Sequence, residues 1–406
     1  MKQIIKRGSF LTFMFMLLGC LSIQAADDDL ITRQITVKLD KAGTLPDKIG
    51  SSKKNLITNL KIVGEVNGTD WCFIREMAGS DYDGNSTKGN LSVLDLSEAE
   101  IVYGGDYYYG DSHYSHYGNQ YYSKCHTFYD EIGINAFAGC SRLTSINLPS
   151  SVTEIQDYAF YGCWRLTSIN IPASITYIST GAFSGCSGLT SLNLPDGITS
   201  IGACAFYRCS GLTSLNLPAN LTTIGSYAFY VCCGLTSLNL PAGITWIGSS
   251  AFYGCSGLTS FTLPASITEI GSSAFYGCSG LTSFTLPAGI TEIGSSAFYS
   301  CSGLTSIYVY ADKVPKMGED VFKGCDAKKC TVYVPKGTYD DYWLSDFGNF
   351  ENIVEFDPTG IDKTTTSTDV KEVSRYSVNG QRLVGPTKGL NIVKYSDGSV
   401  KKVAVE

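Results

Sequence analysis

A 23-residue segment recurs along the middle of this 406-residue chain and keeps its phase from copy to copy. Two neighbouring copies, Leu258–Gly280 and Leu281–Gly303, differ at only two positions. A period of this length is typical of a solenoid, in which each repeat packs only on its neighbours. The leading leucines mark the phase: Leu143, Leu166, Leu189, Leu212, Leu235, Leu258, Leu281 and Leu304.

Each repeat begins with a strand pattern and ends with a compact turn. In Leu212–Pro218, Leu215 and Leu217 alternate with polar residues, and Pro218 has no N–H with which to continue a strand. Farther along a repeat, Ser272 is expected to cap a short helical turn. One repeat cannot bury its apolar side chains, but repeats stacked about 4.8 Å apart can. The sequence therefore predicts a β-rich α/β solenoid of the leucine-rich-repeat type.

The segments around the repeats are expected to close the ends of the solenoid. Residues 27–90 are predicted to form an N-terminal cap, in which Ile35 and its alternate neighbours suggest a strand. Residues 91–356 are predicted to form the solenoid, with a Tyr-rich insertion at 103–129 and a C-terminal cap at 326–356. A stacked array needs such caps, because its last repeats would otherwise expose their apolar faces.

The C-terminal region has a different composition from the repeats. Residues 357–370 are rich in Thr, Ser and Asp and are predicted to be a linker. Residues 371–406 contain Asn379–Gly380, a strong two-residue hairpin signal, and a second turn at Asp397–Gly398. We expect a small antiparallel β unit here.

Residues 1–26 are predicted to be a signal peptide, because a basic start precedes the short apolar run Phe10–Leu18. The export signal predicts a protein that is at the cell surface (outer membrane) or secreted. Leu17–Cys20 favours a lipoprotein with a lipid on Cys20, whereas cleavage after Ala25 favours ordinary secretion. No later segment has the roughly 20 apolar residues of a transmembrane helix, so none is expected.

Charge and motifs argue against several functions. The net charge is −7 with no clustered basic face, so nucleic acid is not an expected partner. Glu154, Glu269 and Glu292 recur at one repeat position and therefore form a face rather than a catalytic pair. Hydrolase, metalloprotease and phosphate-binding motifs are absent from the sequence. We expect no enzyme activity and no cofactor.

Most of the 15 cysteines follow the repeat. At about 5 Å spacing their side chains should run parallel into the core, which favours a ladder of buried thiols over disulfides. Pairing of five cysteines outside the repeat phase stays open: Cys72, Cys125, Cys204, Cys233 and Cys330. The in-phase residues are Cys140, Cys163, Cys186, Cys209, Cys232, Cys255, Cys278, Cys301 and Cys325.

The insertion at 103–129 holds nine tyrosines and all three histidines. It is expected to be a surface loop, and loops on rigid scaffolds commonly carry binding residues. His113, His116 and Cys125 have types that bind transition metals, but solvated histidines are the favoured interpretation and no metal site is predicted. The binding candidates are Tyr107, Tyr108, Tyr109, Tyr121 and Tyr122.

A second tyrosine set follows the phenylalanine of the repeats. Tyrosine is favoured at interfaces, and an exposed aromatic stripe could stack on sugar rings. The alternative, which we favour, is that these rings pack between neighbouring turns. The set comprises Tyr161, Tyr207, Tyr230, Tyr253, Tyr276 and Tyr299.

The repeat pattern L-T-S-x-x-L-P followed by I-T-x-I and A-F-x-x-C resembles the BspA-like leucine-rich repeat family of secreted bacterial surface proteins. The closing segment Val334–Tyr339 and the early segments Asn67–Asp70 and Phe73–Met77 are also similar to that family. The resemblance implies a curved solenoid that adheres to host or cell-surface proteins, and it supplies no catalytic residues. Residues 376–405 resemble, more weakly, the C-terminal sorting tails of Gram-negative secreted proteins.

These observations predict a non-catalytic cell-surface or secreted protein for adhesion or protein–protein interaction with host or bacterial surface macromolecules. The contacts are expected at the polar strand face, at Trp246, Glu269 and Glu292, and in the insertion. The alternative is a glycan-binding module that uses an exposed tyrosine stripe including Tyr253 and Tyr276. The sequence leaves the partner and the oligomeric state open.

Overall fold

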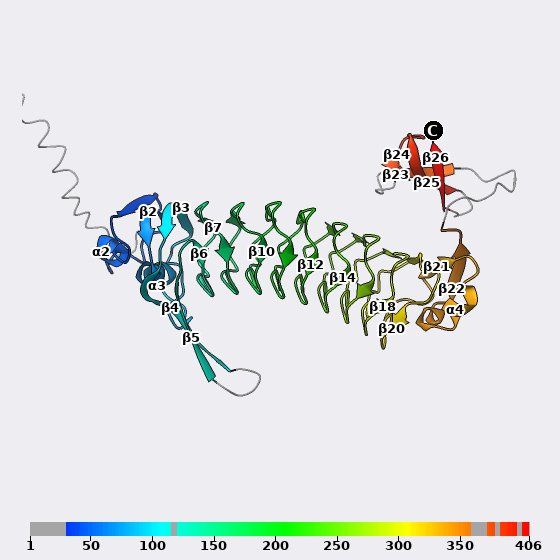
Figure 1. Cartoon of the computed structure of the whole chain (residues 1–406), viewed down its shortest axis with the longest axis horizontal. Helices are drawn as coiled ribbons and strands as arrows, with labels where there is room; N and C mark the ends of the chain where they lie inside the picture. Colours follow the sequence, from blue (N-terminus) through cyan, green and yellow to red (C-terminus); the bar gives the residue numbers. More distant parts are fainter. Residues whose placement is uncertain (1–29, 115–119, 359–371, 378–381, 396–399, 406) are drawn as a thin grey trace, which may run out of the picture.

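The computed structural model describes residues 30–114, 120–358, 372–377, 382–395 and 400–405 (Figure 1). The predicted signal segment 1–26 with Cys20, and residues 359–370 of the expected linker, lie outside these ranges. Coils stack along the long axis of the molecule between two end caps (Figure 1). Among the residues that the structure describes, no helix is long and apolar enough to cross a membrane.

Most repeats form one coil with a first and a second short strand, and equivalent strands of neighbouring coils pair in parallel, as Leu238 does with Phe261 23 residues later. In the repeats that begin at Leu189 and Leu212, a single bridge from Asn193 to Asn216 takes the place of the first strands. The predicted solenoid is therefore confirmed. The first strands are β7 (Ser145–Asn147), β9 (Ser168–Ile169), β13 (Ser237–Asn239), β15 (Ser260–Thr262), β17 (Ser283–Leu286), β19 (Ser306–Val309), β21 (Thr331–Pro335) and β22 (Asn352–Phe356). The second strands are β6 (Glu131–Ile132), β8 (Glu154–Ile155), β10 (Tyr177–Ile178), β11 (Ser200–Ile201), β12 (Thr223–Ile224), β14 (Trp246–Ile247), β16 (Glu269–Ile270), β18 (Glu292–Ile293) and β20 (Lys316–Met317).

A column of phenylalanine rings runs through the core of the stack. Phe275 is fully buried, and its ring lies parallel to those of Phe252 and Phe298 at centroid distances of 5.4 and 5.3 Å. At the N-terminal end Trp71 packs on Phe137, and at the C-terminal end Phe347 packs on Phe322. The caps thus continue the aromatic column and cover its last rings.

The segment after the second strand is a pair of turns, so the expected helical turn near Ser272 is wrong. Ser273 and Gly277 have φ values of +55° and +68°, and such left-handed residues interrupt a right-handed helix. Backbone bonds of 3.1 Å from Tyr276 N to Ser273 O and from Cys278 N to Phe275 O close the turns. The tight turns let the whole coil fit into 23 residues.

Close packing between coils explains one recurring glycine. A Cβ atom on Gly280 would lie 2.4 Å from the carbonyl oxygen of Ser256 in the preceding coil. A Cβ on Gly303 would meet Ser279 O at 2.2 Å. Glycine before the leading leucine therefore permits the short spacing that parallel strands require.

The N-terminal cap and the first coils of the solenoid share one parallel β-sheet. The cap's parallel strands β1 (Ile35–Leu39), β2 (Asn59–Val66) and β3 (Val93–Ile101) form one sheet with β7 and β9. Two helices lie in this cap (Figure 1), α2 (Leu45–Ile49) and α3 (Gly68–Met77). Asn67 begins α3 with a capping box that it forms with Asp70.

Arg75 in α3 satisfies backbone carbonyl groups at the N-terminal end of the first coil. Its buried guanidinium donates to the carbonyl oxygens of Asn135, Ala136 and Ala138 at 2.8, 3.1 and 3.0 Å. In later coils, the carbonyls equivalent to Ala136 and Ala138 accept from the N–H groups of the preceding coil, as Ala159 does from Phe137. Arg75 supplies the donors that a preceding coil would supply.

The C-terminal cap contains α4 (Tyr339–Trp343) and the 3₁₀ helix η1 (Asp346–Asn349) after β21. After residue 371, an antiparallel sheet is formed by β23 (Glu372–Ser377), β24 (Arg382–Leu383), β25 (Gly389–Tyr395) and β26 (Val400–Val405). The expected small antiparallel unit is confirmed, although its predicted turns at 379–380 and 397–398 lie outside the described residues.

Replacing Phe275 with alanine should lower the free energy of unfolding by about 3–5 kcal/mol, because it removes a ring from the buried column and leaves a cavity. Chemical denaturation of the purified protein measures the loss. Ser279→Ala on the same coil is the control, and its exposed side chain should change stability by less than about 0.5 kcal/mol. A loss below about 1 kcal/mol for Phe275→Ala would contradict the packed column.

Replacing Arg75 with methionine should loosen the first coil and leave the middle of the stack intact. The change strips donors from buried carbonyls, at about 1–3 kcal/mol for each unsatisfied group. Amide exchange at Cys140 should rise by about 100-fold or more, while exchange at Phe275 should stay unchanged, because repeats couple mainly to their neighbours. Equal changes at both amides, or none at Cys140, would contradict this role for Arg75.

Candidate functional site

The three residues predicted on the second-strand face lie in one row. Trp246 pairs in register with Glu269, which pairs with Glu292, and Lys316 ends the row. Trp246 and Glu269 are exposed and Glu292 is half-buried. Lys316 Nζ lies 2.9 Å from Glu292 Oε1, so the pair is an exposed ion pair of little stabilising value. We call these four residues the acidic row.

The first-strand face is polar and uncharged along the repeats. Ser237 and Asn239 point outward on β13 while Leu238 is buried between them, and Ser260 and Thr262 repeat this arrangement on β15. Threonine hydroxyls beside these strands donate hydrogen bonds to backbone carbonyl oxygens of the preceding coil. Along the repeats this face therefore offers hydrogen-bonding groups. Toward its C-terminal end, Tyr308 of β19 and Tyr333 of β21 stand on the same face, with ring centroids 4.5 Å apart.

The insertion forms a β-hairpin rather than the expected loop. Strands β4 (Gly104–Tyr114) and β5 (Gln120–Thr127) pair antiparallel and project from the N-terminal end of the stack (Figure 1). Tyr121 and Tyr122 belong to β5, and their side chains lie outside the described residues. Alternating aromatic residues favour strands, which explains why this segment is extended.

The hairpin directs its first tyrosines to different environments. Tyr107 is 45% exposed, whereas Tyr108 is 1% exposed and donates a 2.9 Å hydrogen bond to Ile134 O. Neighbouring residues of a strand point to opposite faces, and β4 packs one face against the N-terminal cap. Tyr109 is half-buried under the guanidinium of Arg75, 4.8 Å from its ring centroid. Tyr108 is therefore packed inside the base of the hairpin and does not add to its exposed surface.

Exposed aromatic side chains gather where the hairpin leaves the solenoid. The ring of His126 lies 5.6 Å from Tyr103, 5.9 Å from Tyr107 and 4.6 Å from Phe128. Tyr103, Phe128 and the following Tyr129 are 56%, 43% and 66% exposed. We call these five residues the hairpin-base cluster. The sequence indicated the insertion but did not single out Tyr103, Phe128 or Tyr129.

The acidic row and the hairpin-base cluster are separate surfaces. Glu131 directly follows the hairpin, and Trp246 lies five strand steps farther along the same row of second strands. At about 4.8 Å per step, the two positions are about 24 Å apart. A small ligand cannot contact both surfaces, whereas a protein partner can.

The repeat tyrosines stack on one another. The rings of Tyr230 and Tyr276 lie 4.6 and 4.5 Å from the Tyr253 ring and nearly parallel to it, and all three are half-buried. Tyr207 begins this stack, and the guanidinium carbon of Arg208 lies over its ring at 5.4 Å. Ring faces that stack on each other cannot also stack on sugar rings, so this geometry does not favour the tyrosine stripe as a glycan platform.

The in-phase cysteines form a ladder of thiols. Cys255 is fully buried and its Sγ lies 3.1 Å from the carbonyl oxygen of Phe229 in the preceding coil, and Cys278 and Cys301 repeat the contact with Phe252 and Phe275. All cysteines of the described residues are free, including the five outside the repeat phase. Burial raises the pKa of the Cys255 thiol to about 12, so its reactive thiolate is scarce at neutral pH.

The described residues show no group of three or more side chains that could hold a metal ion. Cys125 precedes His126 of the hairpin-base cluster in the sequence. Its side chain is buried, and burial raises the pKa of its thiol. The side chains of His113 and His116 lie outside the described residues, so the metal alternative rests on the sequence alone.

Known proteins similar to this chain are leucine-rich repeat proteins. The profile of the BspA type leucine rich repeat region matches residues 122–232 and 222–341, in six copies and over more than half of the chain. Similar solved structures include a leucine-rich repeat protein from Bacteroides ovatus, 28% identical over 56% of this chain and 69% of its own, with a TM-score of 0.36. A leucine-rich repeat protein of T. pallidum is 30% identical over 45% and 76%, with a TM-score of 0.33. A leucine rich cell surface protein from Faecalibacterium prausnitzii is 20% identical over 80% and 88%, with a TM-score of 0.31. No curated protein matches the chain.

Thiol burial predicts selective labelling of the native protein. Iodoacetamide at neutral pH should modify exposed Cys233 and leave Cys255 and Cys278 unmodified, because buried thiols with a raised pKa are neither accessible nor ionised. Peptide mass spectrometry measures the labelling of each cysteine, and denatured protein, in which all thiols react, is the control. Labelling of Cys255 at the rate of Cys233 in the native protein would contradict the ladder.

Proposed function

The chain belongs to the BspA-type leucine-rich repeat family of bacterial surface proteins, and we propose that it binds another protein through the hairpin-base cluster and does so without catalysis. The proposal includes export to the cell surface or the medium, directed by residues 1–26. The acidic row is the second contact surface. The partner is a host or bacterial surface protein, which an elongated scaffold can contact at both surfaces.

The observation that carries this proposal is the concentration of exposed aromatic area in the hairpin-base cluster. Interface centres are enriched in aromatic residues, and large residues there contribute most of the binding energy. The rings of Tyr103, Tyr107, His126 and Phe128 contact each other in edge-on and tilted arrangements, which restrict their motion before a partner binds. A rigid aromatic group loses little side-chain entropy on binding.

The acidic row adds charge selectivity. Glu269 has no basic neighbour in its strand row, because Lys316 pairs with Glu292. A partner with a basic patch would therefore meet an exposed carboxylate next to the indole of Trp246. Such charge pairs at the edge of an interface mainly steer association, so their contribution should fall with increasing salt.

A glycan partner is less well supported by the geometry. Sugar rings bind aromatic side chains by lying on an open ring face, and the stack around Tyr253 covers those faces. Protein binding is therefore the function that the described surface supports best.

Replacing Tyr103 and Tyr129 together with alanine should weaken binding to a protein partner by about tenfold or more, which is the cost of losing one strong contact residue. The measurement is biolayer interferometry of the mature protein against a panel of immobilised matrix and bacterial surface proteins, run beside a glycan array. Tyr339→Ala with Trp343→Ala in α4 is the matched control, since both rings are exposed far from the hairpin. The control should bind like the unchanged protein.

Two outcomes would overturn the proposal. Equal binding by the Tyr103/Tyr129 variant and the unchanged protein would remove the hairpin-base cluster from the interface. Saturable glycan binding without any protein partner would favour the glycan-binding alternative.

A further inference from the structure

In each turn around the repeat phenylalanine, three alternate backbone N–H groups donate to the next coil, and this set of bonds, the turn ladder, runs in one direction. The N–H groups of each turn donate to carbonyls of the next coil, as Phe298 N does to Val321 O at 3.0 Å and Ser300 N to Lys323 O at 2.8 Å. A one-way ladder must leave acceptors without a coil partner at its start and donors without one at its end. At the start, the guanidinium of Arg75 donates to the carbonyl oxygens of Ala136 and Ala138, and the hydroxyl of Tyr108 donates to that of Ile134.

At the end of the ladder, the donors are the N–H groups of Asp320, Phe322 and Gly324, the residues equivalent to Ser296, Phe298 and Ser300. No described group accepts a hydrogen bond from any of these three N–H groups. A carbonyl group bound here would give the N–H of Phe322 the hydrogen bond that the equivalent Phe298 N–H makes to the next coil. The two ends of the ladder therefore differ, because side chains of the protein satisfy its backbone groups only at the N-terminal end.

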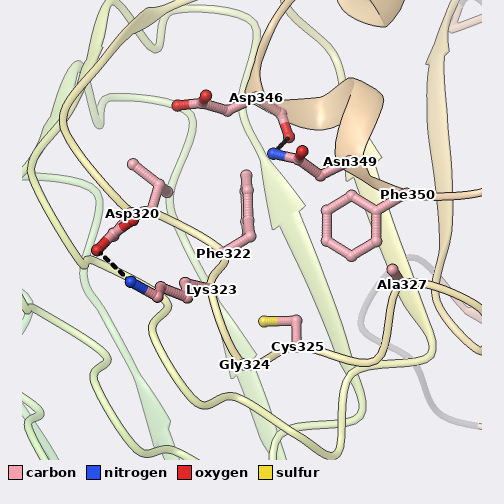
Figure 2. Close-up of a pocket in the computed structure, with 10 residues that line it drawn as sticks. Asp320, Phe322, Lys323, Gly324, Cys325, Ala327, Asp346, Asn349 and Phe350 are labelled. Carbon is pink, nitrogen blue, oxygen red and sulfur yellow. Dashed lines mark hydrogen bonds and ion pairs between the residues drawn. The ribbon is translucent and has the colours of Figure 1, made fainter.

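A cavity of about 370 Å³ lies where the next coil would be. Figure 2 shows its two walls, with Asp320 to Cys325 of the last coil facing Asp346, Asn349 and Phe350 of the C-terminal cap. The volume is within the range of small-ligand pockets. The cavity continues the coil-to-coil interface that the rest of the molecule repeats.

The charges around the cavity select among oxygen acceptors. Lys323 Nζ lies 3.0 Å from Asp320 Oδ2 and is largely neutralised by it, which leaves the Asp346 carboxylate as the excess charge. A negative lining disfavours a carboxylate or phosphate ligand. Neutral main-chain carbonyls remain, and they are the acceptors that every inner coil offers to the same N–H groups.

We propose that this cavity is a binding site for an extended peptide segment of a partner protein. Two carbonyl groups of the bound peptide, separated by one residue, accept hydrogen bonds from Phe322 N and Gly324 N. A basic side chain of the peptide next to them reaches Asp346. The rings of Phe322 and Phe350, 5.3 Å apart, form an apolar wall for the remaining side chains. This mode extends an existing hydrogen-bond ladder, as strand addition to a sheet edge does. It is independent of the hairpin-base cluster.

The first test asks whether the donors are free. In the full chain without ligand, the amides of Phe322 and Gly324 should exchange with solvent at least about 100-fold faster than those of Phe298 and Ser300, because only the latter donate to a further coil. Hydrogen exchange followed by NMR measures all four. Equal protection at the two ends would show that the last donors are already satisfied and would overturn the proposal.

The second test uses two blocked tripeptides, acetyl-Ala-Lys-Ala-N-methylamide and its Glu counterpart. The Lys peptide should shift the amide resonances of Phe322 and Gly324 at about three- to fivefold lower concentration than the Glu peptide, as expected for one exposed charge pair. Asp346→Lys should reverse this preference. Asp340→Lys, an exposed change in α4 outside the cavity lining, is the matched control and should keep it.

Three results would contradict the peptide site. Shifts by sodium acetate that exceed those of both peptides would identify an anion site instead. Peptide shifts that spare Phe322 and Gly324, or a preference that Asp346→Lys leaves unchanged, would place binding elsewhere on the chain.

Discussion

The in-register stacking of near-identical coils is the constraint from which the rest of this structure follows. Each coil is too small to bury its own phenylalanine, leucine and cysteine side chains, and it does so only between two neighbours. The parallel rings around Phe275, with centroids 5.3 and 5.4 Å away, show how closely the coils must agree. The same constraint makes both ends of the stack special, because an end coil has one neighbour too few.

Function in such a molecule is expected where the repetition is interrupted. The repeated faces give uniform rows of Ser, Asn and Thr, and uniform rows cannot favour one partner position over the next. The interruptions include the hairpin with its exposed aromatic base, the exposed aromatic residues Tyr177 and Trp246 in the row of second strands, and the two capped ends. Arg75 shows that an end can be completed by one side chain with several donors, whereas the cavity beside Phe322 shows an end that is not completed.

The sequence predicted what depends on the repeat and missed what depends on single contacts. The 23-residue phase was enough to place Phe275 and Cys255 inside, because stacking leaves one solution for an apolar position in every copy. Tyr108 has no equivalent in other repeats, so its burial depends on how β4 docks against the N-terminal cap, which no local pattern encodes. The left-handed residue Ser273 was missed because serine carries no signal for a positive φ. The roles of Arg75 and of the cavity required the direction of the turn ladder, which only the folded chain reveals.

Deleting one whole repeat tests the stacking account most directly. Removal of the 23 residues Leu258–Gly280 joins two equivalent positions, so the shortened protein should fold, unfold cooperatively and be shorter by about 4.8 Å in small-angle X-ray scattering. Removal of only Leu258–Glu269 puts strands opposite turns and should prevent folding of the stack, seen as lost β-sheet signal in circular dichroism. A folded half-repeat deletion, or an unfolded whole-repeat deletion, would contradict the claim that coil-to-coil register holds this protein together.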